Sequence, residues 1–140
     1  AQEKLAELNR QQGAAFLSEN RSREGVTVRP SGLQYKVLRE GSGLKPTISD
    51  RVTVHYRGRL IDGAEFDSSY ERGEPATFPL AGVIPGWTEG LQIMSVGSKY
   101  RLFVPSDLGY GQKGAGDQIG PDATLIFDVE LLHINGKEPE

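Results

Sequence analysis

The stretch TLIFDVELLHI (residues 124–134) is apolar on both of its alternating faces. One face of an extended chain would carry four apolar side chains, those of Leu125, Phe127, Val129 and Leu131. The other face would still hold three, those of Ile126, Leu132 and Ile134. A strand that is apolar on both faces is covered on both sides, so we predict that it lies near the middle of a sheet.

Three other segments alternate apolar and polar residues with a period of two, which is typical of antiparallel strands with one buried face. Their apolar positions are Leu33, Tyr35 and Val37, then Val52, Val54 and Tyr56, then Tyr100, Leu102 and Val104. Turn residues follow two of these segments, at residues 40–43 and at Asp62-Gly63, a dipeptide that favours hairpins. We therefore predict an antiparallel sheet with short local connections.

One short helix is predicted within this region. Pro85 suits the first turn of a helix, and Trp87, Leu91 and Met94 follow at spacings that share one helical face. A single short helix packed on a curved antiparallel sheet makes an α+β domain. We predict that this domain spans residues 25–140.

The chain begins with a second predicted helix. Residues 1–20 mix good helix formers with charged residues and contain no proline. The apolar stripe is thin, because a polar stretch separates Leu5 and Leu8 from Phe16 and Leu17. We therefore expect residues 1–24 to form an exposed arm that buries little of itself against its own domain. The pattern leaves open whether this arm binds a partner or is a solvated extension.

Composition argues against several classes of function. With 16 basic and 19 acidic residues the net charge is −3, and no cationic track for nucleic acid is present. The chain has no cysteine, which excludes disulfides, thiol nucleophiles and thiolate metal sites. No run approaches the ~20 apolar residues of a membrane helix, so we expect no membrane insertion. His55 and His133 fall on separate strands without ligand spacing, so we predict no metal site.

Two short motifs suggest chemistry that their context does not support. GYGQKG (residues 109–114) satisfies G-x-G-x-x-G, but no helix of apolar period follows it, so we interpret it as a long flexible loop rather than a phosphate site. Ser68 and Ser69 lack a nucleophile elbow, and we expect them to cap a turn after Asp67. His55 lies on the polar side of its strand and is expected to be an exposed, solvated imidazole.

Aromatic residues give the strongest indication of a site. Six fall at turns or strand ends: Tyr56, Phe66, Phe78, Trp87, Tyr110 and Phe127. Each alone is most simply a core residue. Their coincidence with the VIPG turn (residues 83–86) and the glycine-rich loop predicts an apolar pocket. Asp67 precedes Arg72 across a turn, and two interpretations stay open: an ion pair that fixes the loop, or the same contact shaping a pocket wall.

Four segments, in this order and spacing, resemble the FKBP-type peptidyl-prolyl cis–trans isomerases: VHYRGRLIDGAEFDSS (54–69), VIPGWTEGLQIM (83–94), PSDLGYG (105–111) and ATLIFDVELL (123–132). The resemblance runs from about Gly32 to Ile134. The preceding helix, GVTVRPSGLQYKVL (25–38) and GEPATF (73–78) are most similar to the macrophage infectivity potentiator (Mip) branch. The resemblance implies a curved antiparallel sheet wrapped around one short helix, preceded by an extended N-terminal helix.

Carried over position by position, the resemblance implies a pocket with Trp87 as its floor. The implied walls are Tyr56, Phe66, Phe78 and Phe127, and the implied rim and overhanging loop are Val83, Ile84, Tyr110 and Ile119. Asp67 is the implied acidic group and Arg72 its basic partner. The Ile84 backbone N–H and the Tyr110 hydroxyl are the implied donors to a bound carbonyl.

The resemblance implies a peptidyl-prolyl cis–trans isomerase that uses no cofactor. Implied partners are proline-containing polypeptides, macrolide inhibitors of the tacrolimus and rapamycin type, and a second copy bound through a longer N-terminal region. The branch implies a secreted, periplasmic or cell-surface protein that assists folding and host interaction. Ala76, Ala115 and Gln118 depart from many relatives, which bears on peptide preference and macrolide binding more than on the reaction.

Two other classes of function stay open. A non-catalytic peptide-binding or chaperone module would use the same pocket together with the helical arm. A structural assembly protein would instead dimerise through residues 1–20. Acceleration of proline-limited refolding by substoichiometric protein would distinguish an enzyme from both.

Overall fold

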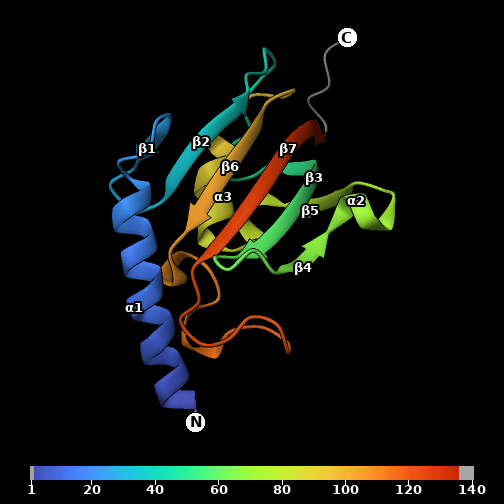
Figure 1. The fold of residues 1–140 in the computed structure, drawn as a ribbon. Coiled ribbons are helices and arrows are strands. Elements are labelled where there is room, and N and C mark those ends of the chain that lie inside the picture. The colour runs from blue at the N-terminus through green and yellow to red at the C-terminus, as the bar shows by residue number, and fades with distance from the viewer. Residues whose placement is uncertain (1, 136–140) are drawn as a thin grey trace.

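The computed structural model describes residues 2–135 as the predicted α+β fold, a curved antiparallel sheet of seven strands around a short helix (Figure 1). Ala1 and residues 136–140, the outer ends of the two predicted domains, lie outside the described residues. The strands are β1 (Val26–Val28), β2 (Gln34–Arg39), β3 (Arg51–Leu60), β4 (Glu65–Ser68), β5 (Ala76–Pro79), β6 (Lys99–Val104) and β7 (Leu125–Asn135). The α-helices are α1 (Gln2–Asn20), α2 (Ser69–Arg72) and α3 (Pro85–Gln92), and the 3-10 turns are η1 (Leu80–Gly82), η2 (Ser106–Leu108) and η3 (Gly111–Lys113).

Strand β7 lies in the middle of the sheet, as its two apolar faces predict. The strand order is β1-β2-β6-β7-β3-β4, with β5 also paired to β3. β7 therefore has hydrogen-bonded neighbours on both edges, β6 and β3. Its inward-facing residues are fully or almost fully buried: Leu125, Phe127, Val129 and Leu131. The predicted hairpin at Asp62-Gly63 joins β3 to β4, with Gly63 at a φ of 95°.

Helix α3 packs on the inner face of the sheet and completes the core (Figure 1). Its predicted apolar residues are buried: Trp87, Leu91 and Met94. The helix ends at Gln92, so Met94 lies just beyond it. A Cβ at Gly90 would lie 2.9 Å from the Leu102 side chain, so glycine allows the helix to approach β6 closely. This packing brings the first turn of α3, and with it Trp87, onto the inner face.

Helix α1 is mostly exposed, as expected, but one of its faces lies against the domain. Leu5 and Leu8 are 42% and 48% exposed, whereas Gly13 and Asn20 are buried. A Cβ at Gly13 would lie 2.3 Å from the Thr124 hydroxyl oxygen, so the helix meets the start of β7 where it has no side chain. The helix therefore buries one narrow face against the domain and leaves the rest of its surface exposed (Figure 1).

The attachment of α1 is largely polar, which explains why apolar periodicity underestimated it. Its contacts are Asn9 Nδ2 to the Pro121 carbonyl (2.8 Å), Arg10 to Asp122 (2.6 Å), Asn20 to Gln34 (2.8 Å), and the Phe16 ring beside the Phe103 ring (6.0 Å between centroids). Three of these contacts come from polar residues of the helix. The division into domains at residues 24 and 25 stays a prediction.

The glycine-rich segment at residues 109–114 forms the 3-10 turn η3, and no α-helix follows it in the described part of the chain. This agrees with the interpretation that it is not a dinucleotide-binding motif. The loop beyond it is internally hydrogen-bonded, because Ala115 and Ile119 exchange backbone bonds of 2.9 and 3.1 Å. These bonds shape the loop that follows η3, and a further backbone bond of 2.9 Å from the Asp122 N–H to the Gly111 carbonyl ties the loop back to the residue after Tyr110.

Candidate active site

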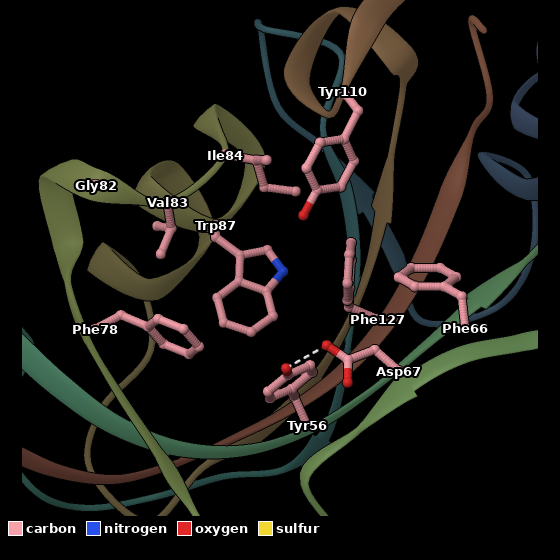
Figure 2. A pocket seen from close by; sticks show the side chains of 10 residues that line it. All are labelled: Tyr56, Phe66, Asp67, Phe78, Gly82, Val83, Ile84, Trp87, Tyr110 and Phe127. Carbon is pink, nitrogen blue, oxygen red and sulfur yellow. Dashed lines mark hydrogen bonds between the residues drawn. The ribbon is translucent and has the colours of Figure 1, made fainter. Parts of the chain in front are cut away.

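The inner face of the sheet holds a hollow of about 300 Å³ enclosed mainly by aromatic rings (Figure 2). Nine of its lining residues were singled out from the sequence: Tyr56, Phe66, Asp67, Phe78, Val83, Ile84, Trp87, Tyr110 and Phe127. The tenth, Gly82, was missed, because a glycine at a chain reversal carries no side-chain signal. The structure thus brings together residues that are up to 71 positions apart, from Tyr56 to Phe127 (127 − 56 = 71).

Each wall of this aromatic pocket comes from a different element. Tyr56 and Phe127 are inward-facing residues of the neighbouring strands β3 and β7, and Phe66 and Phe78 come from β4 and β5. The remaining wall is the turn before α3, where Ile84 is the N-cap residue. Tyr110 reaches in from the segment between η2 and η3. Because sheet, helix and loop are all anchored in one core, the pocket is preformed.

The Trp87 indole is the floor of the pocket, and three rings meet it almost at right angles (Figure 2). Its centroid lies 5.0 Å from that of Tyr56, 5.6 Å from Phe78 and 5.3 Å from Phe127, at interplanar angles of 82°, 87° and 85°. Edge-to-face packing of this kind is the favourable arrangement for aromatic rings. Trp87 is only 4% exposed. Its position is therefore fixed by its neighbours.

A hydrogen-bonded trio forms the polar side of the pocket. The Tyr56 hydroxyl donates to Asp67 Oδ2, and Arg72 donates to Asp67 Oδ1 at 2.6 Å and to the Tyr56 oxygen at 3.1 Å. Partial burial alone would raise the pKa of Asp67, but the hydrogen bonds from Tyr56 and Arg72 outweigh it and hold that pKa below its ordinary value. Asp67 is therefore an ionised, fully engaged acceptor at neutral pH.

The Tyr110 hydroxyl points into the space above the indole (Figure 2). Burial raises the pKa of Tyr110, and the nearby charge of Asp67 raises it further. The hydroxyl is thus protonated at neutral pH and can donate a hydrogen bond. The Ile84 carbonyl accepts from the backbone N–H groups of Trp87 and Thr88 at 2.9 and 3.0 Å, which fixes the backbone at the rim.

Two residues predicted for the site do not line it. Arg72 stands behind Asp67 and contacts the pocket only through the trio. Ile119 is 7% exposed and packs into the core, because its backbone pairing with Ala115 turns its side chain inward. Ile119 therefore supports the overhanging loop from below.

The prediction for His55 is wrong. His55 is half-buried rather than solvated, with its Nδ1 2.8 Å from the Ser69 hydroxyl and its ring stacked on Tyr70 at 4.7 Å. The turn after β4 folds back over β3, which a strand pattern alone does not indicate. Ser68 caps this turn as predicted, because its hydroxyl accepts from the Glu71 N–H at 3.3 Å and forms the N-cap of α2.

Comparison with known sequences settles the family. The sequence model described as FKBP-type peptidyl-prolyl cis-trans isomerase matches residues 43–132. The chain belongs to this family. A second model, described as the domain amino terminal to FKBP-type peptidyl-prolyl isomerase, matches residues 1–37. The resemblance read from the four segments is thereby confirmed.

The FKBP-type relatives include members of the predicted branch. The chain is 53% identical over 133 residues to a probable FKBP-type isomerase FkpA of Neisseria meningitidis, covering 95% of this chain and 49% of that protein. It is 54% identical over 131 residues to the outer membrane protein MIP of Legionella longbeachae, covering 94% of this chain and 56% of that protein. The chain thus spans about half the length of these curated relatives.

Solved structures of the same family have the same fold. The crystal structure of FkpA from Escherichia coli matches with a TM-score of 0.92 and 47% identity, covering 95% of this chain and 62% of that one. A peptidyl-prolyl isomerase of Pseudomonas syringae matches with a TM-score of 0.86 and 40% identity, covering 92% and 95%. Within residues 2–135, none of the helices has the length and hydrophobicity that crossing a membrane requires.

Proposed function

We propose that this FKBP-type chain accelerates cis–trans isomerisation of X-Pro peptide bonds in polypeptides, without a covalent step or a cofactor. The observation that carries the proposal is the Trp87 floor boxed by three nearly perpendicular rings and overhung by Tyr110. Such a site binds a compact apolar ring, and proline is the residue whose side chain forms a ring of this kind. Its polar groups are the fully engaged trio of Tyr56, Asp67 and Arg72, the Tyr110 hydroxyl at the edge, and the Trp87 indole N–H, which is buried and has no acceptor among the described residues.

The reaction needs an environment more than a nucleophile. Rotation about a peptide C–N bond has a barrier of ~18–20 kcal/mol because resonance makes the planar amide rigid. Proline removes most of the trans preference but not the barrier, so unaided X-Pro exchange takes about tens to hundreds of seconds. Half-way through rotation resonance is lost, and the carbonyl is less charge-separated than in the planar state.

A dry, ring-lined pocket therefore favours the twisted amide over the planar one. The planar amide loses more hydration free energy on entry, because its carbonyl dipole is larger. A difference of only ~5–6 kcal/mol between the two states accelerates the reaction ~10⁴-fold. In this proposal the prolyl ring lies on Trp87, and the Tyr110 hydroxyl and the Ile84 N–H hold the flanking carbonyls.

A refolding assay tests this proposal. A protein whose refolding is limited by proline isomerisation should refold faster with substoichiometric amounts of the chain, and the rate should rise with its concentration. A holding module gives the opposite result, since it would suppress aggregation only near equimolar amounts and without turnover. The exposed Leu5 and Leu8 on α1 favour this second function. Replacing both leucines with serine separates the holding function from isomerase activity.

The finer expectations on ligands and assembly belong to the same proposal. Macrolides of the tacrolimus and rapamycin type would compete with the prolyl ring for the aromatic pocket, and inhibition of peptide isomerisation tests this. Ala76, half-buried at the start of β5, stands where many relatives have another aromatic wall, which bears on peptide preference and macrolide affinity. Export is supported by the name of one relative, the outer membrane protein MIP. Pairing of two copies through a longer N-terminal region stays a prediction, and the native mass of a longer chain tests it.

A further inference from the structure

A second hollow lies on the outer face of the sheet, which is turned toward the viewer in Figure 1, where α3 lies behind the strands. We name it the arginine groove. It has a volume of about 220 Å³, and its defining residues are Phe16, Arg23, Arg59, Arg101, Phe103 and Ile126. Successive residues of a strand face opposite sides, so Ile126 faces this groove while Phe127 faces the aromatic pocket. The two sites lie back to back.

Two of the three arginines of the groove, Arg59 and Arg101, share the carboxylate of Asp128, and Arg101 binds it more closely. Arg101 binds both oxygens of Asp128, with Nε at 2.7 Å and Nη2 at 3.2 Å. Arg59 reaches the same oxygens only at 3.5 and 3.4 Å. Three guanidinium groups against the carboxylates of Asp128 and Glu19 give 3 − 2 = +1 at this place, in a chain whose net charge is −3.

Two of these arginines have donors to spare. Arg59 Nε is buried and has no acceptor among the described residues. A buried N–H without an acceptor costs free energy that a bound acceptor would recover. Arg23 lies 3.6 Å from Glu19, beyond hydrogen-bonding distance, with both side chains more than half exposed. Since the bonds of Arg59 to Asp128 are long, its guanidinium can turn toward a second carboxylate without losing a strong bond.

The floor between the arginines is apolar, which restricts the ligand. The Phe16 and Phe103 rings lie 6.0 Å apart across the contact of α1 with β6, and Ile126 continues this surface. The volume is below the ~300–1,000 Å³ of typical small-molecule sites, so it suits one anchoring side chain rather than a nucleotide. An isolated inorganic anion would leave the apolar floor uncovered.

We propose that the arginine groove binds a polypeptide segment that presents a carboxylate next to an aromatic or aliphatic side chain. The carboxylate accepts from Arg59 and Arg23, as guanidinium groups favour. The neighbouring apolar side chain covers Phe16, Phe103 and Ile126. This site does not depend on the proposed isomerase activity, because it shares no residue with the aromatic pocket.

The test uses the blocked peptide acetyl-Phe-Glu-Leu-amide and its matched control acetyl-Phe-Gln-Leu-amide, titrated into the ¹⁵N-labelled full chain. The glutamate peptide should bind saturably and shift the amide signals of Ile126 and Phe103. R59Q or R23Q should weaken this binding about tenfold, because each removes a charged donor. R57Q is the matched control: Arg57 lies on the same strand as Arg59, pairs with Glu65 at 3.4 Å, and does not line the groove.

Four results would overturn the proposal. The first three are equal affinity for the glutamate and glutamine peptides, equal weakening by R57Q and R59Q, and shifts confined to the aromatic pocket. Complete displacement of the peptide by an equal concentration of inorganic phosphate would also overturn it, since the ligand would then be an anion alone. Far-UV circular dichroism and unchanged isomerisation of a short prolyl peptide establish that R59Q is folded. R23Q gives a second variant, because Arg23 lies beyond the end of α1.

Discussion

The Tyr56 hydroxyl donates a hydrogen bond to the Asp67 carboxylate across one wall of the aromatic pocket (Figure 2). The bond joins neighbouring strands β3 and β4, and Arg72 of α2 donates a second hydrogen bond to the same carboxylate. Tyr56 is thereby held with its ring edge-on to Trp87. The two interpretations of Asp67 left open by the sequence coincide, because the contact that fixes the turn also positions a wall of the pocket.

Acid should destabilise the protein partly through Asp67. Its pKa is lowered in the folded state, so the ionised carboxylate stabilises the fold above its unfolded-state pKa of about 3.9, and this contribution is lost as pH falls through the lower folded-state pKa. The difference in unfolding free energy between wild type and D67N should therefore shrink from about pH 5 to about pH 2. Urea unfolding across this range measures it.

The tyrosine supplies the control for that experiment. Y56F removes one of the two side-chain donors to Asp67 and should reduce, without abolishing, the pH-dependent part of the stability. A difference between wild type and D67N that stays constant over the whole range would contradict the role of the trio.

Gly58→Ala should damage the site more than the fold. An added Cβ would lie 2.6 Å from Phe66 Cζ and 2.9 Å from Phe127 Cε1, so both walls must shift. We expect kcat/KM to fall at least about tenfold, with a loss of about 1–3 kcal/mol in unfolding free energy from overpacking. Peptide isomerisation and urea unfolding measure the two effects.

A glycine away from the pocket gives the comparison. Gly63 has a φ of 95° and nothing within 4 Å of an added Cβ, and asparagine tolerates this backbone region. G63N should keep the wild-type rate. Equal rates for G58A and wild type would show that the spacing of Phe66 and Phe127 does not matter for activity.

Tyr110→Phe tests the donor role of the hydroxyl. The ring stays in place while its O–H is lost, so kcat/KM should fall about tenfold, as expected for one hydrogen bond, with little change in stability. Burial raises the pKa of Tyr110, so the wild-type hydroxyl should keep donating up to pH values above its ordinary range. Unchanged activity of Y110F would remove Tyr110 from the mechanism.

The central elements could be predicted from the sequence because their burial is strong and periodic. β7 is apolar on both faces and α3 has an apolar face opened by Pro85, so each pattern has one interpretation. Strands β1, β4 and β5 are three or four residues long, too short for a period to stand out. The environment of His55 depends on Ser69 and Tyr70 folding back over β3, a tertiary event without a local signal.

The pocket was predicted from the sequence pattern, whereas the roles of its residues were predicted from family resemblance. Rings clustered at turns indicate a pocket, but their assignment to floor, wall and rim came from family resemblance, since periodicity alone cannot distinguish a ring in a pocket from one in the core. Ile119 illustrates the limit: it occupies the expected loop, yet its side chain turns into the core. Gly82 was missed for the complementary reason, as it lines the pocket with backbone.

A double-mutant cycle should show how α1 is attached. Gly13→Ala adds a methyl group against Thr124, so it should destabilise the wild-type protein although alanine favours helices. In a T124A background the same change should stabilise by up to about 1 kcal/mol, the helix-propensity gain. Urea unfolding of the four proteins measures the coupling. A stabilising G13A in both backgrounds would mean that α1 is not packed against β7.

The most direct test of the central claim is the rate of isomerisation of an Ala-Leu-Pro-Phe peptide, measured by NMR exchange without a coupling protease. Wild type should accelerate exchange, and the variant carrying both Trp87→Leu and Phe127→Leu should lose about a hundredfold of that acceleration or more. Leucine keeps both positions apolar although it is smaller than either ring, and circular dichroism checks that the variant is folded. A folded double variant with the full wild-type rate would contradict catalysis by the aromatic pocket.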